Sequence, residues 1–471
     1  MKNRILLFLL LISTGFNHLD AQINEHDSLA LVDLYQSTNG KDWSTNNNWL
    51  TAKPVSSWYG VTVSGNRVRG LLLDFNNLKG ALPSSIGNLT AITSLSASFN
   101  EISGAIPDSI GALSSLEDLD MEYNKLSGSI PASFTNLTAL ELVSLNNNRL
   151  TGRLPRDVER LTNLEYFNVF FNRIGGTIPD GFGSIAGLTE LYLNNNELTG
   201  IIPRSLGNLT GMLVLDLSHN RLTGAIPRSF SNFKELFVIS LNNNELAGEV
   251  PFLTASSDIN LNNNHLTQSV NLPVSGGRDY TRVDLRYNNF TFNGLEFAET
   301  KLPNVEYRFQ EKPAVQVRSN QLTVSAGGTL KNNTYAWFRV GAAVPTIIKA
   351  DSTFTPLQSG RYYAVIRNAV ATRLTLTTDT VSFTVALADR VMPIAVSLSP
   401  NPVSNMLTVS GLDAKEDYHL TITDASGYVW VNAMTRKQSS TKIDVNRLKT
   451  GNFLLTISDK AAIKTVRFIK N

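Results

Sequence analysis

Side chains that commonly carry catalysis are few in this chain of 471 residues. It has no cysteine, and its five histidines are scattered, at His18, His26, His219, His265 and His419. The sequence contains no HExxH metal motif, no glycine-rich phosphate loop and no nucleophile elbow. Because catalysis needs convergent groups on a positioned scaffold, we expect no enzymatic activity, no metal site and no cofactor.

A group of aromatic residues is better suited to binding than to catalysis. Tyr166, Phe170 and Tyr192 lie with Asn168 in two short segments of alternating polarity. Exposed aromatic rings among amides can stack on a sugar or anchor a protein loop. Ordinary packing is the alternative, and it is strongest for Phe171, whose repeat position is aromatic elsewhere in the chain. The other four residues form our candidate ligand site.

Three carboxylates form a second candidate. Asp118, Asp120 and Glu122 alternate with apolar residues, which places them on one face of a single strand. Calcium uses oxygen ligands of this kind, but ligands from one strand alone rarely make a cage. The pattern favours a solvated acidic edge, which could still contribute to ligand binding.

Both candidates are positioned by a repeated asparagine. It recurs every 24 residues, apart from one step of 20, within the frame LxLxxNxLxGxIP. The alternating LxL predicts a strand, and a repeat that cannot bury its apolar side alone predicts a solenoid. Asparagine can satisfy backbone donors and acceptors, so we expect it to hold neighbouring coils together. The asparagines of this ladder are Asn76, Asn100, Asn124, Asn148, Asn172, Asn196, Asn220, Asn244, Asn264 and Asn288.

The repeat also predicts the position of every residue in the concave sheet. About ten coils at about 4.8 Å per strand make a sheet on the order of 40 Å long. The central outward column is expected to hold Ser96, Asp120, Ser144, Asn168, Tyr192, Asp216, Ser240 and Asn260. The next outward column is expected to hold Ser98, Glu122, Asn146, Phe170, Asn194, Ser218 and Asn242.

These repeats resemble leucine-rich repeats of the plant-like subtype, found in plant receptor ectodomains and polygalacturonase-inhibiting proteins. The likeness covers roughly residues 71–300 and implies a right-handed solenoid of α/β to mainly β structure. The preceding segment resembles the plant N-terminal cap, but Val55 and Val63 stand where that cap has paired cysteines. Such a cap would be closed by apolar packing around Trp49 and Trp58. This variant resembles caps of bacterial repeat proteins, particularly from Bacteroidetes.

Two further modules follow, and we expect two small β-sandwich domains after the solenoid. Segments such as TYAWFRV and GRYYAVIRN resemble an immunoglobulin-like domain, with Trp337 as its core tryptophan and Tyr362 as its tyrosine corner. From Leu398, the PNP, DxxG and LxxGxxxLxI motifs and a basic end resemble the C-terminal sorting domain of the Bacteroidetes type IX secretion route. That resemblance implies export across the outer membrane, then surface attachment or release.

The N-terminus predicts secretion as well. Lys2 and Arg4 precede an apolar run that is too short to span a bilayer, as in a cleaved signal peptide. We therefore expect five parts: a signal peptide at 1–21, the cap at 22–70, the solenoid at 71–300, the immunoglobulin-like domain at 301–388 and the sorting domain at 394–471.

Composition narrows the class of partner. The formal net charge is +2, from 41 basic and 39 acidic residues, and no basic run indicates nucleic-acid binding. We predict a secreted or outer-surface recognition protein that binds a protein or glycan on the concave face and contacts the type IX machinery through its C-terminal domain. The alternatives are an inhibitor or accessory factor of polysaccharide-degrading enzymes, and a structural or ice-binding solenoid.

Overall fold

The computed structural model describes residues 23–253, 258–270, 282–302, 304–318, 320–385, 395–459 and 463–471. The expected signal peptide, residues 1–21, lies outside these ranges. The chain divides into two compact units, of which the first contains the solenoid with most of the next module and the second contains the C-terminal module. None of the described helices is long and apolar enough to cross a membrane.

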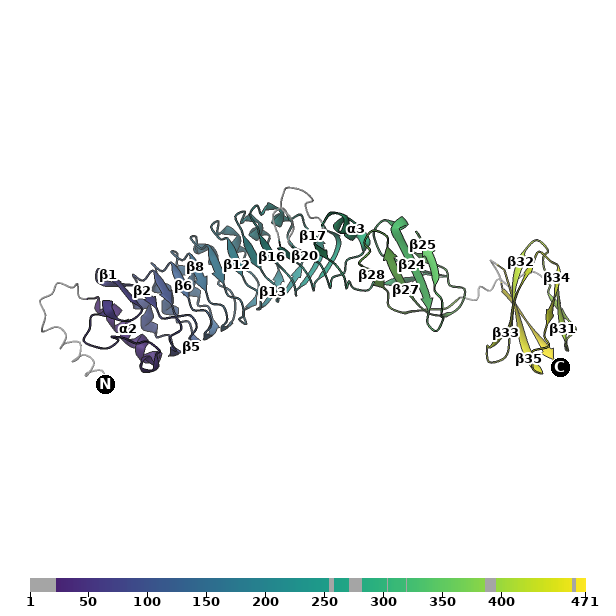
Figure 1. Cartoon of the computed structure of the whole chain (residues 1–471), viewed down its shortest axis with the longest axis horizontal. Helices are drawn as coiled ribbons and strands as arrows, with labels where there is room; N and C mark the ends of the chain where they lie inside the picture. Colours follow the sequence, from purple (N-terminus) through teal and green to yellow (C-terminus); the bar gives the residue numbers. More distant parts are fainter. Residues whose placement is uncertain are drawn as a thin grey trace. The chain divides into compact units, whose positions relative to one another are not determined.

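One long sheet runs through the solenoid and receives a strand from each coil (Figure 1). Its first strand pair is antiparallel, and the later pairs are parallel. The middle residue of each short strand faces the core, as Leu119 and Leu215 do. In sheet order the strands are β1 (Val61–Ser64), β2 (Arg67–Leu72), β4 (Ser94–Ser96), β6 (Asp118–Asp120), β8 (Leu142–Ser144), β10 (Tyr166–Asn168), β12 (Glu190–Tyr192), β14 (Val214–Asp216), β16 (Val238–Ser240), β18 (Asp258–Asn260), β20 (Arg282–Asp284) and β21 (Val305–Glu306).

Each coil from β2 to β18 then adds a second strand, and most of these coils add a 3-10 turn. The second strands form two separate sheets. The first contains β3 (Lys79–Ala81), β5 (Glu101–Ala105), β7 (Lys125–Ser129) and β9 (Arg149–Thr151). The other contains β11 (Gly175–Gly176), β13 (Glu197–Ile201), β15 (Arg221–Gly224), β17 (Glu245–Val250) and β19 (His265–Val270). The turns are η3 (Ser84–Asn88), η4 (Asp108–Ala112), η5 (Ala132–Asn136), η6 (Val158–Arg160), η7 (Asp180–Ser184), η8 (Arg204–Asn208) and η9 (Arg228–Asn232).

The repeated asparagine bonds one coil to the next. Asn124 is 8% exposed, and its Nδ2 donates to Ala97 O of the preceding coil at 2.9 Å and to Met121 O of its own coil at 3.3 Å. Its Oδ1 accepts from Ile102 N of the preceding coil at 2.9 Å. Asn220 makes the same set of bonds. One amide side chain thus satisfies buried backbone groups on two coils, which an apolar side chain could not do.

An aromatic cap covers the start of the solenoid. Its helix α2 (Glu25–Ser37) buries Asp27, whose carboxylate pairs with Arg67 at 2.9 Å. The short turns η1 and η2 follow, at 40–42 and 55–57. Trp49 and Trp58 are buried with ring centroids 4.9 Å apart. Aromatic packing and a buried ion pair therefore stabilise a cap that contains no cysteine.

The helix after the last coil, α3 (Phe292–Lys301), joins the solenoid to the next module. The carboxylate of its Glu296 accepts from Thr329 Oγ1 at 2.7 Å, from Asn332 Nδ2 at 3.1 Å and from Asn368 Nδ2 at 2.6 Å. Burial opposes ionisation of Glu296, but these hydrogen bonds outweigh it and hold its pKa below the ordinary value. A single carboxylate thus connects the helix to two segments of the following module.

The middle module is built from antiparallel strands around Trp337, which is 1% exposed and stacks on Phe354 at 5.4 Å. Trp337 faces Ala364 in strand register. One sheet contains β25 (Thr346–Lys349), β24 (Asn333–Arg339), β27 (Gly360–Asn368) and β28 (Thr375–Thr377), with β29 (Val381–Phe383) beside β27, and the other contains β22 (Val315–Arg318), β23 (Gln321–Val324) and β26 (Thr353–Phe354). The turn η10 (Leu330–Asn332) precedes β24.

The C-terminal module has two antiparallel sheets around a core that includes Leu420, Leu455 and Phe468. The carboxylate of Asp424 accepts from Ser426 Oγ at 2.5 Å and from Trp430 Nε1 at 2.8 Å, and these bonds lower its pKa to about 2. The sheets contain β30 (Ser397–Ser399), β31 (Met406–Ser410) and β34 (Ser440–Asp444), and β33 (Val429–Arg436), β32 (Asp417–Thr423), β35 (Gly451–Ser458) and β36 (Ile463–Lys470).

Candidate ligand-binding face

The candidate residues lie on the outer face of the long sheet, the face that points away from the solenoid core. Strand register aligns one row across this face: Ser96, Asp120, Ser144, Asn168, Tyr192, Asp216, Ser240 and Asn260. Equal coil lengths cause the alignment, because each strand starts at the same repeat position. The shorter coil before Asn264 keeps this register, since Ser240 is still opposite Asn260.

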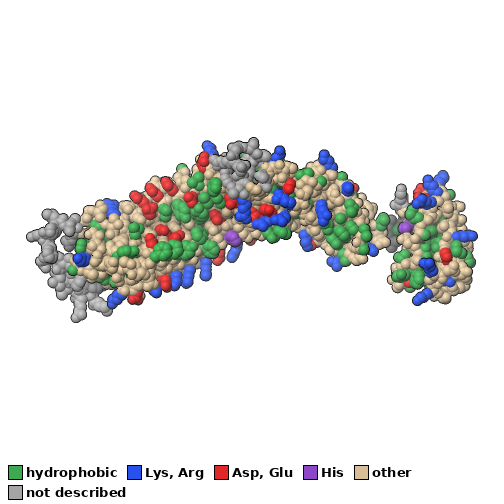
Figure 2. All heavy atoms as spheres, in the orientation of Figure 1, with side chains coloured by type: hydrophobic (Ala, Val, Ile, Leu, Met, Phe, Trp, Pro, Cys, Tyr) green, Lys and Arg blue, Asp and Glu red, His purple; other side chains and the backbone are tan. Residues whose placement is uncertain are grey.

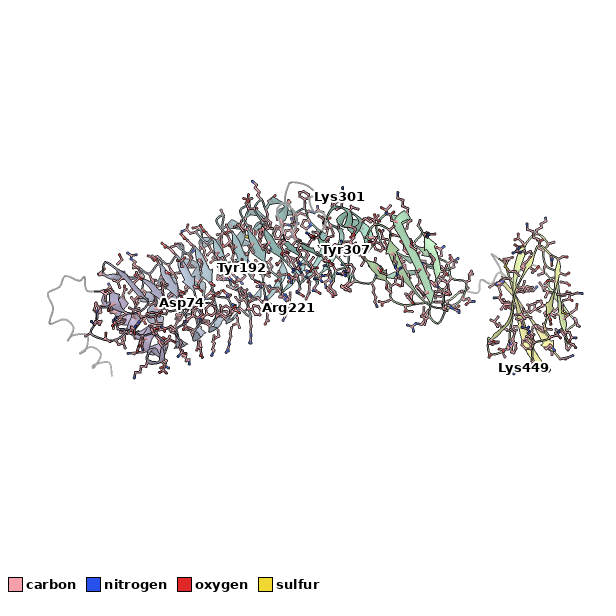
Figure 3. All side chains as sticks on the ribbon, in the orientation of Figure 1. Asp74, Tyr192, Arg221, Lys301, Tyr307 and Lys449 are labelled. Atoms are coloured by element: carbon pink, nitrogen blue, oxygen red, sulfur yellow. The ribbon has the colours of Figure 1, made fainter. Side chains whose placement is uncertain are left out.

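Tyr166 and Tyr192 lie next to one another on this face. Figure 3 labels Tyr192 on the solenoid. The ring centroids of the two tyrosines are 5.6 Å apart, and the ring planes are inclined by 50°. Glu190 lies opposite Tyr166 in register and accepts a hydrogen bond from Tyr192 Oη at 2.8 Å. Both tyrosines are half-buried. The pair therefore offers part of each ring to a ligand while its hydroxyl groups are oriented by neighbouring side chains.

The environment of the pair favours neutral tyrosines in a negative field. Burial is the main cause that raises the pKa of Tyr166, and the carboxylates of Glu190, Glu122 and Asp120 add to it. Burial is also the main cause that raises the pKa of Tyr192, and the hydrogen bond to Glu190 raises it further. Aromatic rings beside carboxylates attract cations through both the ring face and the surrounding charge.

The structure corrects the expected role of Asn168. Its side chain is 4% exposed, so it is not available for direct ligand contact. Its Nδ2 donates to Tyr166 Oη at 2.7 Å, and its Oδ1 accepts from Phe170 N at 3.1 Å. Asn168 therefore orients the aromatic residues of the site.

The neighbouring row is also more enclosed than the expected outward column. Its polar members fill the spaces between strands, as Ser218 does by donating from Oγ to Asp216 Oδ1 at 2.6 Å. Phe170 and Glu122 remain half-buried and so keep some accessible surface. The enclosed members, between 1% and 7% exposed, are Ser98, Asn146, Ser218 and Asn242.

Asp118 and Asp120 of β6, with Glu122 shortly after this strand, lie two strands away from Tyr166 of β10 and three from Tyr192 of β12. Asp118 is exposed, and Asp120 and Glu122 are half-buried. Asp120 Oδ1 accepts from Glu122 N at 3.2 Å. In the part of the chain that the structure describes, no three His, Cys, Asp or Glu side chains converge as metal ligands. These residues form an acidic edge beside the aromatic site, and Figure 2 shows acidic and hydrophobic side chains gathered over this half of the solenoid.

Two acidic residues beside the tyrosines were not among the candidate site residues, although Asp216 was expected in the central outward column. Glu190 bonds Tyr192, and Asp216 follows Tyr192 in the central row. Burial raises the pKa of Asp216, although hydrogen bonds from Ser218 oppose the shift. The signal was present: Glu190 lies two residues before Tyr192 and therefore on the same face of the same strand.

A second aromatic group lies at the position before the ladder asparagine. Phe75, Phe99 and Tyr123 stack with ring centroids 4.3 and 4.4 Å apart and ring planes inclined by 8° and 11°. These three residues have positive φ, as do Asn195 and His219 at the same repeat position. The position is thus a fixed turn of the repeat, and successive aromatic residues there pack on one another.

The comparisons with known families agree with this architecture. Residues 115–137, 163–185 and 186–246 match leucine rich repeat families. Residues 397–471 match the secretion system C-terminal sorting domain. The chain contains leucine-rich repeats and a secretion sorting domain. No curated protein matched the sequence.

These families set the class of the protein. Leucine-rich repeats and sorting domains are typical of binding proteins without enzymatic activity, and the sorting domain indicates type IX secretion with surface attachment. The predicted fold class is confirmed: a parallel-sheet leucine-rich-repeat solenoid, mostly strands with few helices, is followed by antiparallel sheets. The predicted secreted or surface location is confirmed as well.

Solved structures of plant proteins resemble the solenoid. A plant ice-binding protein is 27% identical with a TM-score of 0.50, and the match covers 57% of this chain and 88% of that one. The plant peptide hormone receptor RGFR1, solved in complex with RGF2, is 32% identical with a TM-score of 0.46 over 51% of this chain. That match spans 39% of the receptor chain.

Proposed function

We propose that this protein is secreted, displayed on the outer cell surface, and captures a basic segment of a protein ligand on the outer face of its long sheet. Tyr166, Phe170 and Tyr192 would contact the ligand, Asn168 would orient them, and Asp118, Asp120 and Glu122 would attract it. The repeats support protein binding, and the sorting domain supports export through the type IX machinery.

The proposed parts are those expected from the sequence. A signal peptide at 1–21 and the sorting domain at 394–471 would direct export. The cap at 22–70 and the solenoid at 71–300 would present the binding face. The immunoglobulin-like module at 301–388 would act as a spacer in a Bacteroidetes surface protein.

One observation supports the proposal that the ligand is basic. The strands from β6 to β14 contain Asp118, Asp120, Glu190 and Asp216 but no Lys or Arg. Two tyrosine rings lie in the middle of this run. Carboxylates steer a cationic segment to the face, and aromatic rings anchor its side chains once it is bound.

Capture of synthetic peptides tests the proposal. We expect a peptide array to show binding that increases with the positive charge of the peptide and decreases with added salt, because exposed charges are screened. The triple variant Tyr166→Ala, Phe170→Ala, Tyr192→Ala should lose at least about tenfold in affinity, or roughly 1.4 kcal/mol. Surface plasmon resonance with the best basic peptide would measure the loss.

A matched control is available on the same solenoid. The variant Phe75→Ala, Phe99→Ala, Tyr123→Ala also removes three aromatic rings, but these lie outside the proposed site. It should bind the peptide like the wild type. Equal losses in both variants, or unchanged binding by the Tyr166 variant, would reject the site.

The likeness to a plant ice-binding protein supports a second candidate less well. Ice binding needs a flat and regular surface, and the sheets of second strands are interrupted between β9 and β11. The first of them also carries Lys79 and Lys125, both paired with Glu101, at 3.6 and 2.7 Å. A charged and interrupted surface favours the protein-binding proposal.

A further inference from the structure

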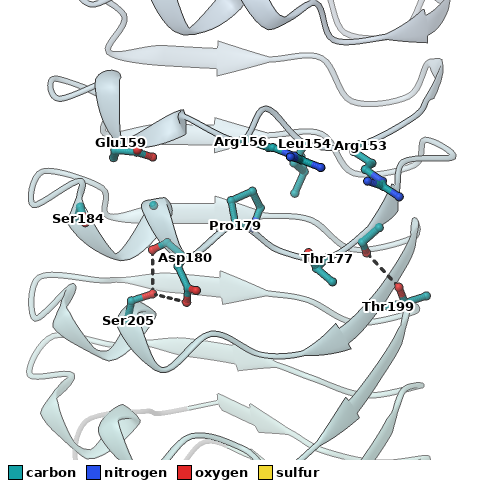
Figure 4. Close-up of a pocket in the computed structure, with 12 residues that line it drawn as sticks. Arg153, Leu154, Arg156, Glu159, Thr177, Pro179, Asp180, Ser184, Thr199 and Ser205 are labelled. Carbon is teal, nitrogen blue, oxygen red and sulfur yellow. Dashed lines mark hydrogen bonds between the residues drawn. The ribbon is translucent and has the colours of Figure 1, made fainter.

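A groove opens where the stacking of two coils is interrupted. The sheet of second strands stops at β9 and resumes at β11, and an isolated bridge between Arg153 and Gly175 links these coils. The turn η6 has three residues, whereas η5 and η7 have five each. A groove of about 750 Å³ lies at this point (Figure 4), and neither tyrosine of the long sheet lines it.

The sequence departs from the repeat at this point. In three coils, the serine two residues after the repeat proline donates to the preceding coil, as Ser205 Oγ does to Asp180 O at 2.8 Å. Ser85 and Ser109 at the same position make no such bond. Asp157 and Gly181 replace this serine in two consecutive coils. A glycine has no hydroxyl to donate, so the coil of Gly181 lacks this link to the coil before it.

A second exchange makes room for a carboxylate. In a regular coil, the serine packs against a glycine of the preceding coil, and a Cβ atom on Gly183 would lie 2.2 Å from Ser205 O. At the groove, Glu159 occupies the glycine position and Gly181 occupies the serine position. A Cβ atom on Gly181 would lie 2.1 Å from Glu159 Oε2. The small and the large residue are thus exchanged as a pair, and the side chain of Glu159 occupies the space that Gly181 leaves open.

The groove has a cationic end and an acidic end, as Figure 4 shows. Arg153 and Arg156 lie at one end, with the hydroxyls of Thr177 and Thr199 nearby. The stem of Arg153 lies across Gly176, where an added Cβ atom would be 2.9 Å from Arg153 Cγ. Both arginines are exposed, and within the described ranges neither has an ion-pair partner.

The other end carries oxygen atoms. Glu159 and Asp180 supply carboxylates, and Ser184 and Ser205 supply hydroxyls. Asp180 Oδ1 accepts from Ser205 Oγ at 3.3 Å. Carboxylates can accept hydrogen bonds from the hydroxyl groups of a ligand, and serine hydroxyls can both accept and donate them.

We infer that this groove is a second binding site, for an acidic oligosaccharide. Arg153 and Arg156 receive the carboxylate or sulfate group, because the guanidinium fork matches such oxyanions in two parallel hydrogen bonds. The acidic end receives sugar hydroxyls. A volume of about 750 Å³ lies within the range of ligand sites, which is roughly 300–1,000 Å³.

The lining favours a carbohydrate over a peptide. Peptide and protein sites are anchored by aromatic or large apolar side chains in pockets. Here the large apolar side chain of the lining is Leu154, which is 3% exposed, and Pro179 adds a small apolar surface. The remaining contacts offered to a ligand are charges and hydroxyls. This site is independent of the peptide site proposed for the long sheet.

Calorimetry with the full chain and a trimer made of two neutral hexoses and one terminal uronate tests the inference. The wild type should bind the trimer, and the fully methyl-esterified trimer, which lacks the charge, should bind at least about tenfold more weakly. Arg153→Gln and Arg156→Gln together should also lower the affinity at least about tenfold. Glu159→Gly with Gly181→Ser restores the regular serine and glycine pair, so it should abolish binding while keeping the thermal stability of the wild type.

Arg204 provides the control. It follows a repeat proline, as Arg156 does, but it does not line the groove. Arg204→Gln should bind the trimer like the wild type. The inference is overturned if the wild type does not bind the trimer, if the esterified trimer binds as well, if inorganic sulfate binds as tightly as the trimer, or if Arg204→Gln weakens binding as much as the groove variants.

Discussion

Two aromatic groups on the same solenoid differ in how their rings meet. Phe75, Phe99 and Tyr123 stack nearly parallel, with centroids 4.3 and 4.4 Å apart, so neighbouring rings cover one another's faces. Tyr166 and Tyr192 are 5.6 Å apart and inclined by 50°, so their faces are not covered in this way. In the stacked group the rings pack against one another, whereas the tilted pair leaves ring surface for a partner.

The surroundings of the two groups differ as well. The stacked residues occupy a turn position with positive φ that the repeat fixes in every coil. The tilted pair is embedded in hydrogen bonds to Asn168 and Glu190. Exposure alone therefore does not identify a binding residue on a repeat protein. The polar partners that orient a side chain are the better indicator.

The largest effect should come from the asparagine ladder that holds both groups in register. Asn124→Ala leaves Ile102 N without its acceptor. It also removes one of the two donors from the carbonyl groups of Ala97, Met121 and Glu122. An unsatisfied buried group costs about 1–3 kcal/mol, and we expect a loss of about 3 kcal/mol. Denaturant unfolding would measure it.

Asn163→Ala is the control for that prediction. Asn163 is exposed and makes one hydrogen bond, from Nδ2 to Thr138 O at 3.1 Å. Its loss should cost under about 1 kcal/mol. A similar cost for both substitutions would show that the ladder does not support the solenoid as described.

A smaller effect is expected from Phe99→Asn in the stacked group. This substitution removes two ring contacts, each worth about 0.5–1.5 kcal/mol. Asparagine tolerates positive φ better than phenylalanine and already occupies this position at Asn147 and Asn195. We expect a net loss of about 1 kcal/mol in denaturant unfolding and unchanged capture of a basic peptide. A loss of capture would remove the functional distinction between the two aromatic groups.

The smallest effect concerns protonation of the tilted pair. Burial and Glu190 raise the pKa of Tyr192 above its ordinary value of about 10. The folded state therefore holds this proton more tightly, and the resulting stability is present below about pH 10 and is lost as the pH rises further. Tyrosinate absorbance between pH 10 and 11 should be nearly the same in the wild type and in Tyr192→Phe. A clear decrease in the variant would mean that Tyr192 ionises normally.

Much of the fold followed from the sequence because the coils have equal length. The 24-residue period set the strand register, and the predicted row from Ser96 to Asn260 is the row that the pairing shows. The LxL pattern likewise identified buried residues such as Leu119 and Leu215. These properties depend on local spacing, which the sequence contains.

Properties that depend on crowding between strands could not be predicted in this way. Alternation placed Asn168 outward, but packing between Tyr166 and Phe170 encloses its amide. The interruption at Gly181 depends on the size of Glu159 in the preceding coil, which only three-dimensional stacking reveals. Aligning the coils would have shown the missing serine, but not the groove.

The carboxylate of Glu296 gives the molecule a mechanical property. A surface protein held at one end experiences tension when its ligand is pulled away. The bonds from Glu296 to Thr329, Asn332 and Asn368 start at one side chain and reach separate segments. Tension across this joint loads these bonds together with the ion pair between Arg373 and Glu299 of the same helix, so they jointly resist separation of the solenoid from the next module. Shear resistance at this joint then limits how hard a bound partner can be pulled.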